Sequence, residues 1–489
     1  MPRSYSSCPP YHPGARQKAA PTTVRSAFLQ TIALSLLVIV LLCIAALQPL
    51  YTQDSNYFGL KSQVEREPSS SGSDFGDVRW AQYSPWRAME EYRAPPEGCV
   101  VTQVNLLERH GARYPTYDAE VEIKAALEKM QAVRAYADEK FGFIPDFVYD
   151  LGTEDLVPLG WMQYVEHGEM DYARYSHLFG GGDDESGISF VRAAGSSRVI
   201  ESAMNWTAGV AHKSRGRSNP GLSLVIDELP GVNNSLHNNL CLHPDDSTPQ
   251  GETYLAIFAP SIRARLAASS ELNLTNADIP PLISLCPFHS VALQTVSPWC
   301  SIFTPADFAS FEYYHDLKKY YRNGYGATVG RVQGIAYVAE LIARLTHTPV
   351  RDTTQTNSTL DSGEGTFPLG RTFYADFSHD HEIAGVMSAL GLFRDEEGVM
   401  DPREEGEERE WRVREMVPFG GRMVVERLGC LSSGEEMEYV RVLVNDRVMP
   451  LEFCEGFSGD GICRLDRFVE SQGYTTRGGD GDWEKCFDV

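Results

Sequence analysis

The sequence lacks several features that would assign a protein to common functional classes. None of its 10 cysteines forms a CxxC pair, which makes a zinc ribbon and a thioredoxin-type redox site poor interpretations. Basic residues are few: 43 Lys and Arg stand against 67 Asp and Glu, and the net charge of −24 argues against a nucleic-acid partner. No internal repeat is found. The hydrophobic content of 42% and aromatic content of 11% are those of a globular protein and exclude a disordered one.

The N-terminal segment differs in composition from the rest of the chain. Residues 1–26 contain four basic residues and no acidic one, and residues 27–47 are almost wholly apolar. A helix of that length just spans a hydrocarbon core of about 30 Å, and the preceding positive charges place the N-terminus in the cytosol. We therefore expect a cytosolic tail (1–26), a single-pass transmembrane signal anchor (27–49), a flexible stem (50–77) and a domain at 78–489. If the apolar segment is instead a cleaved signal peptide, the protein is secreted.

The sequence beyond residue 77 fits an exported domain. Eight cysteines lie there, an even number, so we expect four disulfide bonds in an extracytoplasmic chain. Asn-x-Ser/Thr sequons begin at Asn205, Asn233, Asn273 and Asn357. The sequence therefore predicts a glycoprotein domain that lies outside the cell or in the secretory or vacuolar lumen.

The stretch VVTQVNLLERHGARYP, at residues 100–115, is the most informative in the chain. Its first half is a β-branched, strand-like run, and its second half gathers Arg109, His110 and Arg113 around Gly111. Thr116 is a good N-cap for the helix-like segment that follows. The pattern predicts a strand, a tight loop and a helix, with two guanidinium groups and an imidazole at the end of the strand.

These side chains suit a phosphate monoester. Arginine is always charged and can bind phosphate oxygens through two parallel hydrogen bonds. An imidazole between two permanent cations is hard to protonate, so its lone pair stays available at low pH. We therefore expect His110 to be a nucleophile and Arg109 and Arg113 to bind the phosphate.

Two further segments have the same strand–loop–helix pattern. Residues 188–193 are strand-like and precede a Gly-Ser-Ser turn with Arg198, and residues 371–377 precede Ser378, His379 and Asp380. Ligands of open α/β sheets bind at the carboxyl ends of strands, so the three loops are expected to meet in one site. Asp380 would supply the acid that protonates a poor leaving group.

A metal site is the alternative for the histidines on either side of Asp380. Three adjacent loop residues rarely point at one ion, and the sequence offers no further ligand cluster near His379 and His381. We therefore expect neither a metal nor another cofactor.

The strings RHGARYP (109–115) and SHD (378–380) resemble the active-site signature of the histidine acid phosphatases, and most closely the fungal phytase-like branch. WAQYSP (80–85), GSSRVI (195–200) and residues 442–450 extend the resemblance over nearly all of residues 78–489. It implies an α/β domain with a central mixed sheet flanked by helices. The helical patterns add an inserted, mainly helical lobe at approximately 116–185 and 240–346.

The resemblance also implies the role of each site residue. His110 would form a phosphohistidine intermediate, Asp380 would protonate the leaving alcohol, and the phosphate would be held by Arg109, Arg113, Arg198 and His379. The implied disulfide pairs are Cys99–Cys430, Cys241–Cys486, Cys286–Cys300 and Cys454–Cys463.

The substrate-pocket candidates are Lys318, Lys319 and His381. The lysine pair is phytase-like, but residues 117–120 (YDAE) replace the lysine-rich segment that secreted fungal phytases carry, and His381 replaces their common Asn. We expect small phosphate esters, either phytate or a broader set of phosphomonoesters, as substrates. One alternative is a catalytically inactive surface protein that binds phospholigands with the same fold, and another is a metal-dependent phosphohydrolase.

Overall fold

The structure is a computed structural model that describes residues 75–180, 189–267, 272–354, 358–395, 398–406, 409–432 and 435–488. The expected cytosolic tail, signal anchor and most of the stem, at 1–74, lie outside these residues, as does the sequon at Asn357. Within the described part of the chain, no helix combines the length and the apolar character needed to cross a membrane.

A mixed sheet lies at the centre of the domain, in the order β3-β2-β4-β1-β5-β6-β7, with β8 paired to β6. Neighbours among β1, β2, β3 and β4 are parallel, whereas β1 pairs with β5 in antiparallel register. The expected mixed sheet is therefore confirmed. The strands are β1 (Cys99–Arg109), β2 (Phe190–Ala194), β3 (Leu224–Ile226), β4 (Phe373–Ser378), β5 (Arg422–Ser432), β6 (Glu435–Val444), β7 (Arg447–Val448) and β8 (Ile462–Arg464).

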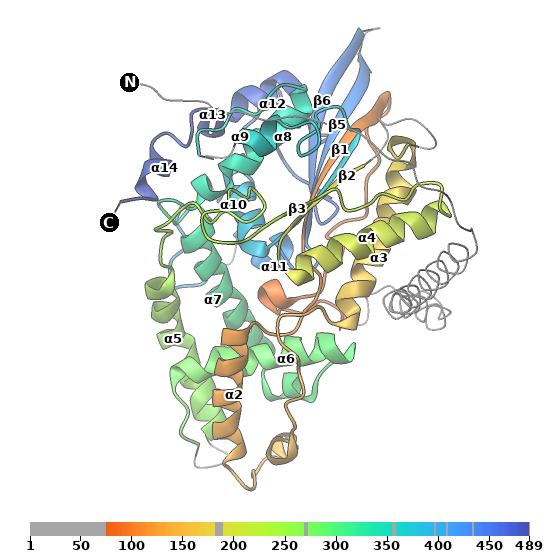
Figure 1. The fold of residues 1–489 in the computed structure, drawn as a ribbon. Coiled ribbons are helices and arrows are strands. Elements are labelled where there is room, and N and C mark those ends of the chain that lie inside the picture. Colours follow the sequence, from red (N-terminus) through yellow and green to blue (C-terminus); the bar gives the residue numbers. More distant parts are fainter. Residues whose placement is uncertain are drawn as a thin grey trace, which may run out of the picture. The chain divides into compact units, whose positions relative to one another are not determined.

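Helices flank this sheet, as expected. Figure 1 shows α3 and α4 on one side of the sheet, α8 and α10 on the other, and α2, α5, α6 and α7 in a helical lobe. Helices α3 and α8 fall inside the sequence ranges expected for the lobe, but they pack against the sheet. The helices are α2 (Tyr117–Gln131), α3 (Pro158–Tyr175), α4 (Ser197–Ser214), α5 (Thr248–Ala267), α6 (Ile279–Leu293), α7 (Pro305–Asn323), α8 (Ile335–Thr346), α9 (Ser358–Ser362), α10 (Asp380–Leu390), α11 (Val413–Met416), α12 (Leu465–Ser471), α13 (Gly473–Thr476) and α14 (Asp482–Lys485).

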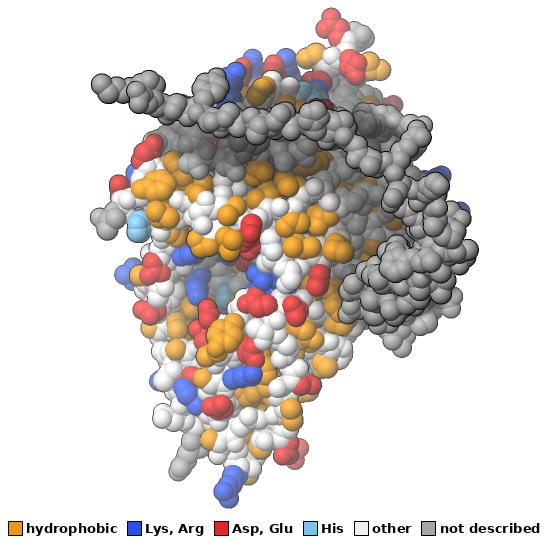
Figure 2. Space-filling view, viewed as in Figure 1, with side chains coloured by type: hydrophobic (Ala, Val, Ile, Leu, Met, Phe, Trp, Pro, Cys, Tyr) orange, Lys and Arg blue, Asp and Glu red, His pale blue; other side chains and the backbone are white. Residues whose placement is uncertain are grey.

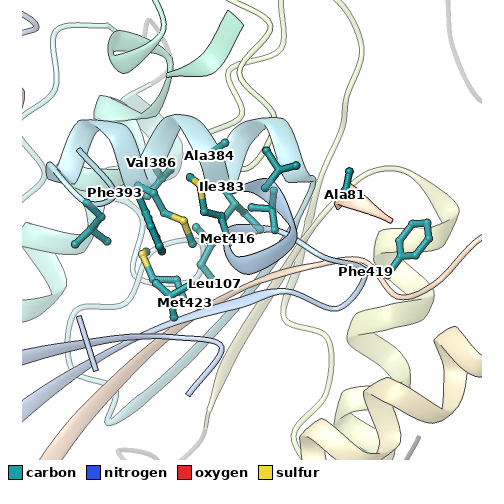
Figure 3. Close-up of a cluster of buried hydrophobic side chains, with 14 of the residues drawn as sticks. Ala81, Leu107, Ile383, Ala384, Val386, Phe393, Met416, Phe419 and Met423 are labelled. Carbon is teal, nitrogen blue, oxygen red and sulfur yellow. The ribbon is translucent and has the colours of Figure 1, made fainter. Parts of the chain in front are cut away.

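Helix α10 is fixed to the sheet by apolar packing. Figure 3 shows Ile383 and Val386 of α10 facing Leu107 of β1 and Met423 of β5, and all four side chains are buried. Full burial of an aliphatic side chain of this size contributes about 1.5–3 kcal/mol. The packing places the first residue of α10, Asp380, at the end of the central strands.

The disulfide bonds are those that were expected, and the turn between β6 and β7 contains residues that favour its conformation. The four disulfides that the resemblance implied are all present: Cys99–Cys430, Cys241–Cys486, Cys286–Cys300 and Cys454–Cys463. At the hairpin between β6 and β7, Asn445 and Asp446 have φ angles of 47° and 69°. Two successive positive φ values are those of a type I′ turn, in which Asn and Asp are favoured.

Candidate active site

The three expected loops begin at one edge of the sheet. Arg109, the last residue of β1, is in register with Ser378, the last residue of β4. Ala193 of β2 is in register with Phe377, one residue before the end of β4. The loops that carry His110, His379 and Arg198 therefore leave their strands side by side, and the side chains expected to act together lie close to one another.

The loop after β1 is held by α3 and α4. The amide of Gly111 donates to Ser202 Oγ at 3.0 Å, and the amide of Ala112 donates to Gln163 Oε1 at 2.9 Å. A Cβ atom on Gly111 would lie 2.6 Å from the carbonyl oxygen of Gly160. Glycine is required here because the loop and the start of α3 approach more closely than a side chain allows.

Arg109 is fully buried and only partly hydrogen-bonded. Its Nη1 donates to the carbonyl of Val417 at 2.8 Å and to that of Gln82, and its guanidinium carbon lies 4.6 Å from the ring centroid of Phe419. Its Nε and Nη2 have no hydrogen-bond partner among the described residues. A buried guanidinium with unused donors is prepared to receive an anion.

His110 is held as a neutral imidazole with a defined tautomer. Its Nδ1 lies 3.0 Å from the carbonyl oxygen of Gly111, which can only accept, so Nδ1 carries the proton and Nε2 carries the lone pair. Burial, together with the charges of Arg109, Arg113 and Arg198, lowers the pKa of His110 well below its usual value. Nε2 therefore keeps its lone pair at acidic pH.

Two more arginines complete the cationic side of the site. Arg113 donates from Nη1 to the carbonyl of Tyr114 at 2.8 Å. Burial and the neighbouring guanidiniums of Arg109 and Arg198 lower its pKa to about 10. Arg198, in the first turn of α4, forms an ion pair of 2.7 Å with Glu154 and keeps a buried Nε without a partner among the described residues.

The nearby Arg192 is paired with carboxylates inside the sheet layer and does not belong to this cationic group. It is buried within β2 and is bound by Asp376 at 2.7 Å and by Glu340 at 2.6 Å. Its charge is therefore compensated inside the sheet layer, and Arg198 is the arginine of this segment whose charge lowers the pKa of His110.

Asp380 is surrounded by cations at the start of α10. Lys319 Nζ lies 2.8 Å from Oδ2, and Arg109 Nε lies 4.0 Å from Oδ1. Burial alone would raise the pKa of this carboxyl group, but Lys319 and Arg109 outweigh burial and hold it well below its usual value. Asp380 is therefore ionised in the free protein.

His379 is positioned by a carboxylate that the sequence analysis did not identify. Its Nε2 donates to Glu228 Oε1 at 2.8 Å, and the same oxygen accepts from the amide of Ser196 at 2.9 Å. Glu228 follows β3, so a fourth strand end contributes to the site. Burial would raise the pKa of Glu228, but the hydrogen bond and charge of His379 lower it to about 2.

The three substrate-pocket candidates have different neighbours: two lie beside Asp380, and the third lies beside Tyr314. Lys319 binds Asp380, and His381 Nδ1 lies 3.9 Å from Asp380 Oδ1. Lys318, one residue earlier on α7, places its Nζ 5.3 Å from the ring centroid of Tyr314. Figure 2 shows basic and acidic side chains close together with a histidine near the middle of one face of the molecule.

Other residues near the site were also missed by sequence reasoning. Gln82 Nε2 lies 3.0 Å from His315 Nδ1 on α7, and the rings of His315 and Tyr83 are 5.4 Å apart. Gln82 and Tyr83 belong to the WAQYSP string, which was noted only as part of the resemblance. His315 sits one helical turn before Lys318 and Lys319, and this spacing is the signal that could have identified it.

Comparisons with known proteins give a consistent result. Residues 100–445 match the histidine phosphatase superfamily (branch 2). Phytase A of Neurospora crassa is 39% identical over 83% of this chain and 91% of its own length, and phytase A of Aspergillus awamori is 38% identical over 83% and 90%.

Solved structures share the fold. The phytase from D. castellii aligns with a TM-score of 0.68 and 22% identity over 82% of this chain and 85% of its own. A Bifidobacterium longum multiple inositol polyphosphate phosphatase, in complex with inositol hexasulfate, aligns with a TM-score of 0.61 and 15% identity over 82% and 98%.

Proposed function

The chain belongs to the histidine phosphatase superfamily, branch 2, and is a phytase-like phosphomonoester hydrolase, in which we propose that His110 is the nucleophile. One observation carries this proposal. The Gly111 carbonyl fixes the proton on Nδ1, which leaves a neutral Nε2 among the guanidiniums of Arg109, Arg113 and Arg198. Attack by Nε2 forms a phosphorus–nitrogen bond and breaks the ester phosphorus–oxygen bond. Water then cleaves the phosphohistidine, releasing phosphate and restoring the imidazole.

The cations stabilise charge on the transferred group. Arg109 offers Nε and Nη2, and Arg113 and Arg198 each have a buried Nε without a hydrogen-bond partner among the described residues. Positioned donors in a buried site are worth more than in water and need no reorganisation during the reaction. We assign these three arginines and His379 to the binding of the phosphoryl oxygens.

Asp380 is the proposed general acid, and its ionised state in the free protein limits when it can act. Lys319 and Arg109 keep its pKa low, so its proton has to be acquired as substrate binds. A phosphate that pairs with Arg109 would compensate the charge of that guanidinium and bring negative charge near Asp380, and both effects raise the carboxyl pKa. The monoanion of the substrate is one source of this proton.

We propose that the substrates are phosphomonoesters that include inositol hexakisphosphate. Relatives named phytase A support this substrate class, and Lys319 and His381 supply polar groups beside Asp380. The acidic residues Asp118 and Glu120, in the first turn of α2, offer no attraction to a polyphosphate. We therefore expect weaker discrimination between phytate and simple esters than a lysine-rich pocket would give.

We further propose that the domain is exported and tethered by residues 27–49 as a single-pass signal anchor, or is secreted if that segment is cleaved. Four disulfides suit an oxidising compartment. Asn273 lies exposed in a loop, where a glycan can be accommodated, whereas Asn233 is buried.

The experiment that tests the function is turnover of inositol hexakisphosphate and of an aryl phosphate by the full chain and by His110→Ala. The proposal expects near-complete loss of both activities in the variant. His177→Ala is the matched control, because His177 bonds to the carbonyl of Val101 away from the site. Substrate binding without turnover by the unaltered protein would instead favour a phospholigand-binding role.

A further inference from the structure

Glu228 lies between two imidazoles at the edge of the active site. Its Oε1 is 2.8 Å from His379 Nε2, and its Oε2 is 4.0 Å from His237 Nδ1. One ligand atom from each of these three residues lies within 4.8 Å of the other two. Among the described residues, this is the one group of three histidine, cysteine or acidic side chains with such spacing.

His237 has an unused nitrogen that faces this group. Its Nδ1 is buried and has no hydrogen-bond partner in the described part of the chain, while its ring interacts with Asn239. The ring centroid of His237 lies 5.0 Å from that of His379 and 5.0 Å from that of His381. A buried nitrogen without a partner, aimed at a carboxylate, is unusual enough to require an explanation.

We propose that Glu228, His237 and His379 bind a divalent transition-metal ion, with Zn²⁺ the best fit, and that the bound ion inhibits the phosphatase. The inhibition rests on the proposed function of the site, whereas the binding does not. Two imidazole nitrogens and one carboxylate oxygen are a ligand set that suits Zn²⁺, and the remaining position can be taken by water.

The distances allow such a site after small side-chain movements. Zinc binds these atoms at about 2.0–2.2 Å, so ligand atoms in a tetrahedral site are about 3.3 Å apart. His379 Nε2 lies 2.8 Å from Oε1 and His237 Nδ1 lies 4.0 Å from Oε2 of Glu228, and the three ligand atoms lie within 4.8 Å of one another, so the side chains must move closer together to reach this spacing. The amide of Ser196, which already donates to Oε1, would orient the carboxylate from outside the site.

Two nearby carboxylates, Glu154 and Asp380, are already paired with basic side chains, and Glu228 is therefore the carboxylate that can bind a metal ion. The guanidinium of Arg198 acts on both histidines, and Glu154 pairs with it at 2.7 Å. Lys319 is paired with Asp380 at 2.8 Å. Arg109 and Arg113 act on His110 beside His379, so an ion would be bound against their repulsion.

Metal binding would remove His379 from phosphate binding. The ion would replace the proton that Nε2 now donates to Glu228. With Nε2 bound to the ion, this nitrogen has no proton to donate, and the ring is held toward Glu228 and His237 instead of the phosphoryl oxygens. The enzyme should consequently lose turnover as the site fills.

The first test adds Zn²⁺ to the full chain during hydrolysis of an aryl phosphate, which avoids chelation of the metal by phytate. We expect activity to fall with Zn²⁺ and to recover with EDTA. In His237→Ala, activity without Zn²⁺ should be retained. The inhibitory Zn²⁺ concentration should rise by at least about 10–100-fold, which is the cost of losing a residue that only orients a metal ligand. His237→Phe keeps a ring against His379 and His381 and replaces the first variant if alanine disturbs folding. His212→Ala, which removes an exposed histidine paired with Glu169, is the control.

The second test measures binding without activity. The full chain is titrated with Co²⁺, whose visible absorption reports tetrahedral coordination, and then with Zn²⁺ to displace it. A single saturable site in the unaltered protein that is lost in both His237 variants supports the proposal. Absence of a saturable site, or equal Zn²⁺ inhibition of unaltered protein and His237 variants, would overturn it. Binding in a protein that shows no turnover would refute the proposed function and leave the metal site standing.

Discussion

Lys319 Nζ lies 2.8 Å from Asp380 Oδ2, although the two residues come from the helical lobe and from the sheet layer. The pair connects a lysine expected to bind substrate with the carboxyl group expected to donate a proton. The protonation of Asp380 therefore depends on the charge of Lys319.

Asp380→Asn should reduce hydrolysis selectively. An amide cannot donate a proton to an alkoxide, so kcat for an alkyl phosphate should fall by about 10²–10⁴-fold. An aryl phosphate with a good leaving group needs little protonation and should lose much less. Parallel kcat measurements on the two esters provide the check, and equal losses on both would argue against the role of Asp380.

Lys319→Met should extend the hydrolysis of alkyl esters to higher pH. Lys319 lowers the pKa of Asp380, so removing its charge raises that pKa and keeps the acid protonated to higher pH. The pH at which kcat for an alkyl ester begins to fall should therefore rise. Lys318→Met is the matched control, because Lys318 places its Nζ near Tyr314. A downward movement, or an identical change in both variants, would contradict the assignment.

Gly111→Ala should damage the catalytic loop. The added Cβ would lie 2.6 Å from the carbonyl oxygen of Gly160, so the loop or the start of α3 has to move. We expect a loss of stability of about 1–3 kcal/mol and a larger relative loss of activity, measured by denaturant unfolding and by kcat. Gly365→Ala, at a glycine with no atom within 4 Å of a built Cβ, should change neither property.

Asn273 should carry a glycan when the full chain is made in a eukaryotic host. Asn273 is exposed in a loop, whereas Asn205 lies within α4 with its Nδ2 bonded to the carbonyl of Glu201 at 2.8 Å. Asn273→Gln should reduce the mass that an N-glycosidase removes, while Asn205→Gln should leave it unchanged. A mass change with the second variant alone would contradict this reading of the surface.

Local sequence patterns predicted much of the fold and of the site. The 100–115 string and the SHD string each encode a strand end, a loop and a helix start, and the structure confirms these elements. Thr116 accepts from the amide of Ala119 as an N-cap should. Such features depend on residues close in sequence, which is why the expected strand–loop–helix segments could be predicted.

Contacts between distant segments could not be predicted in the same way. Glu228 and His237 follow a three-residue strand, and only the parallel pairing of β3 with β2 brings them to His379. The same holds for the contact between Gln82 and His315, which lie 233 residues apart in the sequence and meet beside Tyr83. Nothing in the local pattern around Glu228 and His237 distinguishes these two residues from ordinary loop positions.

The central claim is that Nε2 of His110 accepts the phosphoryl group, and trapping the covalent intermediate tests it most directly. The full chain is mixed with a labelled aryl phosphate, quenched rapidly in alkali, and digested to locate the label. We predict acid-labile, alkali-stable phosphate on the peptide that contains His110. Turnover at a normal rate with no label on that peptide, or with label that survives acid, would contradict the account.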